Sequence, residues 1–155
     1  MSTDRSELGQ FSSIICFKAI VTGAEEALGE KAAMITLISA GRARGKQVAE
    51  QLGIKGKGTS PEELVPLLQQ ALGKNGTKLC IVDKIEQTAE SIKVYCRETI
   101  CSAGEPQGSP RKLTFTQGAI QGVMESVMGL RLRGKQTESV LRGSSHDVIE
   151  FEVIG

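Results

Sequence analysis

Two pairs of glycines, each inside a helical pattern, constrain the fold of this chain more than any other feature of its sequence. The segment "ITLISAGRARGKQVAEQLG", residues 35–53, has the apolar spacing of an amphipathic helix and carries Gly41 and Gly45 in its middle. Each glycine costs a helix about 1 kcal/mol relative to alanine. Both fall on the same stripe as Ile38, so we predict that they are buried and leave a trough in the helix surface. Three basic residues flank this trough and are expected to point largely to solvent: Arg42, Arg44 and Lys46.

A later segment repeats the arrangement. In "GAIQGVMESVMG", Gly118 and Gly122 are again four residues apart, with Val123 and Met124 beside them. Either the two helices cross closely, small face against small face, or a ligand fills the trough between them. Close packing is the commoner use of paired small residues. Methionine suits both readings, because its flexible side chain fills a core and also adapts to a ligand.

Composition describes an ordinary globular domain. The chain has 155 residues, 39% hydrophobic and 24% charged, with a net charge of +1, so no field of one sign would attract nucleic acid. Only 3% of the residues are aromatic, which argues against base stacking. The apolar run "IICFKAIV" is too short to span a bilayer. The four cysteines have no C-x-x-C spacing, and we expect a cytoplasmic protein with reduced thiols.

The order of the predicted elements indicates an α+β domain with N-terminal helices and an antiparallel four-stranded sheet, in which a helix is inserted between two β-hairpins. Residues 1–10 are expected to form a flexible tail, and residues 11–155 a single domain. A strand is an alternative for the first half of the first helix, because that half is rich in β-branched residues. Helices are predicted over 12–28, 30–52 and 61–72 and from about Thr116, and strands within 77–87, 91–101, 130–141 and 146–155.

Local signals mark the helix at 61–72 most clearly. Ser60 is a good N-cap, Pro61 fits the first turn, and Glu63 completes a capping box. Pro66 is close enough to the start of this helix to bend it without ending it.

No catalytic set can be assigned. The chain has one histidine, His146, and no G-x-G-x-x-G fingerprint. The loop "GIKGKGTS", residues 53–60, lacks the ending of a P-loop, and no apolar strand precedes it. The acidic pairs at the helix starts are explained by the helix dipole. We therefore expect no enzyme and no cofactor.

The chain resembles the four-vinyl-reductase (hydrocarbon-binding) domain over roughly residues 25–153. The resemblance rests on "LGEKAAMITLISAGRARGKQVAE", a following hairpin, "LTFTQGAIQGVMESVMG" and the closing strands "QTESVLRGSSHDVIEFEV". That family is related in fold to the small subunits of the TRAPP vesicle-tethering complex. The resemblance implies an α+β domain that often dimerises and binds small apolar molecules or acts as a sensor module; some members are linked to tetrapyrrole synthesis.

One departure from the family concerns metal. Many members carry a cysteine pair in the closing hairpin around a glycine that matches Gly143, but here Ser139 and Ile149 occupy the corresponding places. His146 alone could not hold zinc, which requires four ligands. We therefore expect no metal site.

Three functions remain open at this point: non-enzymatic binding or sensing of a small hydrophobic ligand, a homodimeric interaction or scaffold module with a closed core, and a tetrapyrrole-related enzyme or accessory protein. For the first, the glycine-bearing faces and the resemblance predict a pocket. The relatives in the tethering complex also suggest acylation of Cys80 or Cys96, although inert burial of both thiols is the alternative. The predicted pocket residues are Ile38, Gly41, Gly45, Gly118, Gly122, Val123 and Met124.

Overall fold

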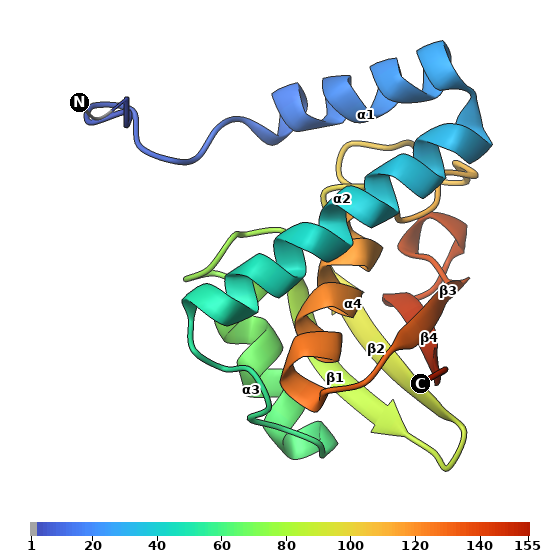
Figure 1. The fold of residues 1–155 in the computed structure, drawn as a ribbon. Coiled ribbons are helices and arrows are strands. Elements are labelled where there is room, and N and C mark those ends of the chain that lie inside the picture. The colour runs from blue at the N-terminus through green and yellow to red at the C-terminus, as the bar shows by residue number, and fades with distance from the viewer. Residues whose placement is uncertain (1–2) are drawn as a thin grey trace.

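The computed structural model describes residues 3–155 of the chain and has an α+β architecture (Figure 1). The first two predicted helices and the helix after Ser60 are all present, so the strand alternative for the first helix is wrong. The fourth helix begins at Phe115, one residue before the predicted start. The elements are α1 (Ile14–Leu28), α2 (Glu30–Gln51), α3 (Pro61–Leu72), β1 (Ile81–Gln87), β2 (Ser91–Arg97), α4 (Phe115–Met128), β3 (Leu132–Glu138), the 3-10 helix η1 (Val140–Arg142) and β4 (Asp147–Val153).

The four strands form one antiparallel sheet in the order β1-β2-β4-β3, which confirms the predicted fold class. Each hairpin pairs internally, and β4 joins them by pairing with β2. Ile92 lies opposite Phe151 and Val94 opposite Ile149, and all four side chains are buried. The neighbouring positions of β2 and β4 carry the Lys93–Glu150 pair, so one face of the sheet meets the core and the other meets solvent.

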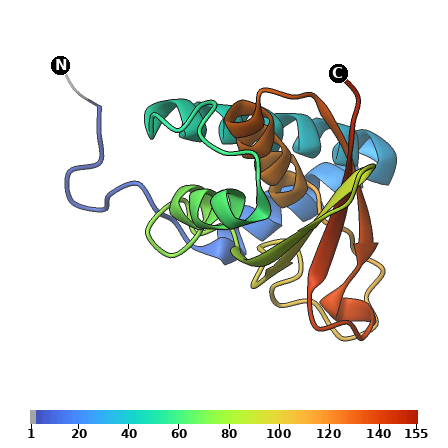
Figure 2. The same cartoon turned by 90° about the horizontal axis from the view of Figure 1, so that it is seen from below.

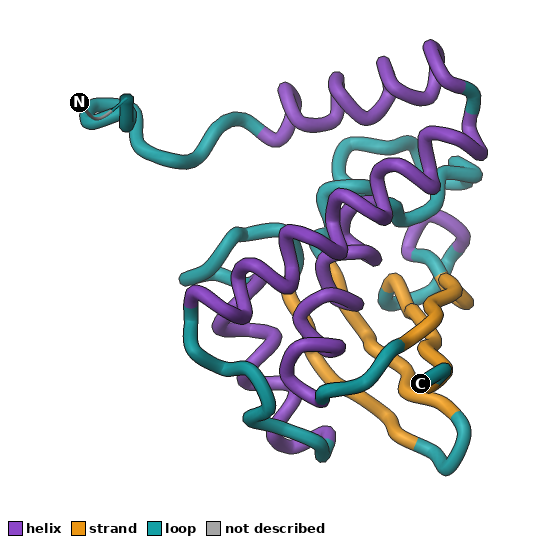
Figure 3. The backbone as a smooth tube through the Cα atoms, in the orientation of Figure 1, coloured by secondary structure: helices purple, strands orange, loops and turns teal. Residues whose placement is uncertain are grey.

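Helix α4 is the centre of the molecule. Of its 14 residues, 11 are buried, because it lies between the sheet and α2 (Figure 2). A helix that is packed on both sides cannot move away from a crossing helix. It therefore needs small residues wherever the other backbone comes close. Helix α3 packs against β1 and α4, and completes the helical layer over one face of the sheet (Figure 3).

The start of α3 shows how local sequence determines an element. Ser60 Oγ accepts a hydrogen bond from the Glu63 amide at 3.3 Å, and Glu63 Oε1 accepts one from the Ser60 amide at 3.3 Å. The capping box predicted from the sequence is therefore confirmed. Pro66 lies inside the helix without ending it, as predicted.

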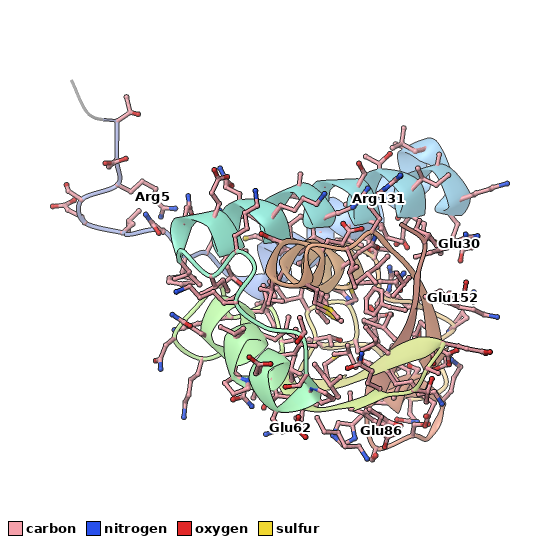
Figure 4. The ribbon with its side chains drawn as sticks, turned by 60° about the horizontal axis from the view of Figure 1, so that its bottom comes forward. Arg5, Glu30, Glu62, Glu86, Arg131 and Glu152 are labelled. Carbon is pink, nitrogen blue, oxygen red and sulfur yellow. The ribbon has the colours of Figure 1, made fainter. Side chains whose placement is uncertain are left out.

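Charged side chains surround the molecule on all elements. The labelled examples in Figure 4 come from distant parts of the chain and lie around the rim of the molecule. These are Arg5, Glu30, Glu62, Glu86, Arg131 and Glu152. Within residues 3–155, no helix combines the length and the apolar character needed to cross a membrane.

Candidate ligand-binding site

The two glycine pairs lie against each other where α2 crosses α4. A Cβ atom added to Gly41 would lie 2.1 Å from the carbonyl oxygen of Phe115, and one on Gly45 would lie 2.2 Å from that of Ala119. On the opposite helix, a Cβ atom added to Gly118 would lie 2.0 Å from the carbonyl oxygen of Ile38, and one added to Gly122 would lie 2.1 Å from that of Arg42. Real Cβ atoms do not make such contacts, so each glycine is required by the backbone of the other helix.

This geometry changes the interpretation of the predicted pocket. All four glycines are buried, as expected, but backbone fills the space between the two glycine faces, where the sequence analysis left room for a ligand. Val123 and Met124 lie fully buried in the core, and Ile38 is half-buried on α2. The structure thus brings six of the seven predicted residues together at one crossing, and Met124 lies in the core on the same helix. Ligand binding by them stays a prediction, and the close-packing alternative accounts for their contacts.

Arg42 does not point freely to solvent, which corrects the expectation for this residue. Its Nε donates to Glu125 Oε1 at 2.6 Å and its Nη2 donates to Glu125 Oε2 at 3.1 Å, across the α2–α4 crossing. The Glu125 side chain is only 2% exposed, and it also accepts a hydrogen bond from the Leu132 amide at 2.8 Å. Burial raises the pKa of Glu125, but Arg42, the Leu132 amide and the charge of Lys46 outweigh it and hold the pKa below its ordinary value.

A cavity of about 790 Å³ lies elsewhere, between α1, the C-terminal half of α2 and the loop after α3. Its volume falls within the range of about 300–1,000 Å³ usual for small-molecule sites. In Figure 1, α1 and α2 meet at one end and diverge towards the N-terminus of α1, with the loop after α3 below the opening. The apolar wall includes Phe17 and Ile20 of α1, Val48 of α2, Leu52 at the C-terminal end of α2, Leu79 and Phe115.

The polar part of the cavity wall carries positive charge and no negative charge. Amide and hydroxyl side chains contribute to it, together with the cations of Arg44 and Lys78; the neutral polar residues are Gln10, Ser12, Ser13, Gln51, Gln70, Asn75 and Thr77. The wall contains no aspartate, glutamate or histidine.

Helix α1 is held over the cavity by one ring contact and one group of ion pairs. The Phe17 and Phe115 rings meet edge to face with their centroids 5.2 Å apart. Lys18 Nζ donates to the Cys101 carbonyl oxygen at 2.7 Å and to Glu105 Oε2 at 2.6 Å.

A second cation completes this attachment. Arg111 pairs with Glu25 of α1, and its Nε lies 3.0 Å from Glu105 Oε1. The hydrogen bond from Lys18 is the strongest influence on Glu105. Together with Arg111 it outweighs burial, which acts in the opposite direction, and lowers the pKa of Glu105 to about 2. These contacts attach α1 to the loop that precedes α4.

The cysteines divide into one exposed and three buried thiols. Cys16 is exposed on α1 and lines the cavity. Cys80 and Cys96, the two predicted acylation candidates, are 3% and 0% exposed and line no part of it. The neighbouring Cys80 thiol, burial and the charge of Asp147 raise the pKa of Cys96 well above its ordinary value, which disfavours the reactive thiolate. Acylation of Cys80 or Cys96 remains untested.

The surroundings of His146 are those of a surface histidine. Its Nε2 lies 2.8 Å from Asp83 Oδ2, and its Nδ1 lies 2.9 Å from the Ser145 hydroxyl. Throughout the described part of the chain, no three His, Cys, Asp or Glu side chains come together in a way that could hold a metal ion. Ser139, one of the positions without the family's cysteine, caps η1 by accepting from the Leu141 amide.

Sequence reasoning missed the cavity because its wall comes from four separated segments. Residues 10–20, 44–52, 70–79 and the pair Ile100 and Phe115 share no local motif. One signal was present: "IICFKAIV" is apolar on more than one side of α1, so part of this helix needs a partner besides α2.

Comparisons with known proteins support the fold. No protein-family model and no curated protein matches the sequence. Among solved structures, the phenol-responsive sensory domain of the transcription activator PoxR with phenol is similar, with a TM-score of 0.68 and 14% identity over 93% of this chain and 76% of that one. Subunit 3 of the trafficking protein particle complex from Naegleria fowleri, covalently bound to palmitic acid, has a TM-score of 0.64 and 14% identity over 92% of this chain and 93% of that one. The expected fold relation to TRAPP subunits is thus confirmed.

Proposed function

We propose that this chain is a non-enzymatic domain that binds or senses a small hydrophobic ligand, and that the ligand occupies the cavity beneath α1. The observation that carries the proposal is the cavity itself: about 790 Å³, with phenylalanine, isoleucine, leucine and valine in its wall. A hollow of this size beneath a helix, open to solvent on one side and lined by apolar side chains, can bury a small molecule.

The fold comparisons favour the same class of function. One similar structure is a phenol-responsive sensory domain, and the other carries palmitic acid. Both are described with an apolar small molecule, although neither is similar enough in sequence to indicate which ligand this chain takes. We propose on this basis that the chain is a member of the hydrocarbon-binding domain family.

The cavity also offers a way to report occupancy. Phe17 and Ile20 of α1 form one side of it, and the contacts that attach α1 to the body include Phe115 and the Glu105 ion pairs. A ligand would contact α1 directly. If it binds only when α1 is in place, the free energy of binding stabilises this position of the helix. This coupling is what a sensor module requires.

The test is to fill the cavity with a side chain. The neutral fluorophore N-phenyl-1-naphthylamine, which brightens in apolar surroundings, should bind the parent protein with saturation. Leu52→Trp places bulk into the wall at a residue that is already 39% exposed, and should weaken probe binding at least ten-fold. Val153→Trp, at an exposed position of β4 outside the wall, is the matched control and should bind like the parent. Failure of the parent to bind the probe would contradict the proposal.

A homodimeric interaction module is the second candidate, and a specific surface favours it. Helix α1 and the start of α2 expose Ile15 by 78%, Ile20 by 68% and Ile35 by 63%. Exposed apolar side chains on a helix suit a helix from a second copy, and full burial of each isoleucine would contribute about 1.5–3 kcal/mol.

A further inference from the structure

The charges in the cavity wall go beyond the requirement for a hydrophobic ligand. We infer that the ligand is an amphiphilic acid, with a hydrocarbon body against the apolar wall and a carboxylate that is attracted by the two cations of the wall, Arg44 and Lys78. This inference rests on the proposed function, because it places the ligand in the same cavity.

The first step is the charge count. The chain as a whole is almost balanced, with 19 basic and 18 acidic residues. Its cavity wall is not balanced: of 21 residues, two are cations and none is an acid. A carboxylate entering this cavity would therefore meet attraction without a neighbouring like charge to oppose it.

The second step is the state of Arg44. Its Nη1 donates to Gln47 Oε1 at 2.8 Å and to Gln51 Oε1 at 3.5 Å, both neutral amides. Two residues earlier, Arg42 donates twice to the buried Glu125 carboxylate. Within residues 3–155, the Arg44 guanidinium contacts only these two neutral amides, so its remaining N–H groups are available for a bidentate contact.

The third step is the opposite side of the cavity. Lys78 Nζ lies 5.0 Å from the centroid of the Phe11 ring, and the described chain offers it no carboxylate partner within 4.0 Å. Polar groups and cations thus lie on both sides of an apolar cavity.

A matched pair of probes tests the inference. Dodecanoate and dodecanol have the same hydrocarbon length but differ in head-group charge at pH 7, and both can be measured by displacement of N-phenyl-1-naphthylamine. Dodecanoate should bind the parent at least about ten-fold more tightly, which is the usual gain from charge-assisted hydrogen bonds. Arg44→Gln/Lys78→Gln should remove this preference and leave dodecanol binding within two- or three-fold of the parent value. Lys31→Gln/Lys55→Gln, which removes the same charge at exposed sites outside the cavity, should retain it.

The outcomes separate the two proposals. Equal binding of dodecanoate and dodecanol would overturn the carboxylate inference and leave the hydrophobic cavity standing. Binding of neither compound, with no binding of the fluorophore, would overturn both. Cosedimentation with mixed phosphatidylcholine–phosphatidylglycerol vesicles, lost in Arg44→Gln/Lys78→Gln, would assign the two cations to a lipid surface and also overturn the inference. We expect no cosedimentation.

Discussion

Arg42 of α2 and Glu125 of α4 form a two-point hydrogen-bonded ion pair at the crossing of the two helices, with donor–acceptor distances of 2.6 and 3.1 Å. It lies beside the glycine contacts, at the carbonyl of Arg42 that Gly122 approaches. The glycines allow the two backbones to come close, and this closeness lets the arginine reach a carboxylate that is otherwise buried. The pair therefore fixes the register of one helix on the other.

Removal of Arg42 should be strongly destabilising. Arg42→Leu leaves the Glu125 carboxylate buried with only the Leu132 amide and Lys46 near it, and we expect a loss of about 2–4 kcal/mol in the free energy of unfolding. Arg44→Leu, on the same helix with neutral partners only, should change it by less than about 0.5 kcal/mol. Urea denaturation measures both, and equal effects would show that the ion pair has no special role.

A single methyl group at the crossing should also be costly. Gly118→Ala would place Cβ near the Ile38 carbonyl oxygen and force the helices apart, for a loss of about 2–3 kcal/mol. Gly23→Ala, inside α1 with nothing within 4 Å of the added atom, should stabilise the protein by about 0.5–1 kcal/mol. Thermal and urea unfolding provide the comparison. If Gly118→Ala melts like the parent, the close contact is absent in solution.

The attachment of α1 should depend on pH. The folded-state pKa of Glu105 is about 2, below the ordinary value of 4.5, so its ion pairs stabilise the fold fully above about pH 4.5 and lose this contribution as the pH falls towards 2. Glu105→Gln should cost on the order of 1–2 kcal/mol at pH 7, after allowance for partial solvent screening. The difference between parent and variant should shrink steadily between pH 4.5 and pH 2. A difference that is constant over this interval would contradict the assignment.

The thiols should react in two classes. Ellman's reagent should modify Cys16 within the first phase, because it is the exposed thiol, and should reach Cys80, Cys96 and Cys101 only on unfolding. Cys16→Ser should remove the fast phase. Since Cys16 lines the cavity, a saturating ligand should slow the fast phase in the parent. Rapid labelling of two or more thiols in the folded protein would show that the core opens readily.

The exposed face of α1 should mediate self-association. Sedimentation at micromolar concentration should show a dimer for the parent, and Ile15→Asp should shift it to a monomer while leaving the fold unchanged by circular dichroism. Val153→Asp, at an exposed position of β4, makes the same kind of change outside α1 and should remain dimeric. A monomeric parent would contradict the dimer prediction.

Much of the fold could be predicted from local sequence alone, because the signals act over short distances. Ser60 and Glu63 begin a helix through hydrogen bonds three residues apart, and the alternation around Val94 and Ile149 specifies which face of a strand is buried. The spacing of the glycine pairs predicted burial and a possible helix crossing for the same reason: the position of a residue around a helix follows from its number alone.

Tertiary structure decided what those glycines contact and where the cavity lies. Nothing local distinguishes Arg42, which binds Glu125, from Arg44, which lines the cavity, since the two differ only in the neighbours that folding brings to them. Phe17 and Phe115 are 5.2 Å apart in space but far apart in the chain. The sequence by itself determined the elements and their buried faces. Whether backbone or a ligand fills the glycine trough depends on how the two helices pack. The cavity likewise forms only when four distant segments of the chain have been brought together.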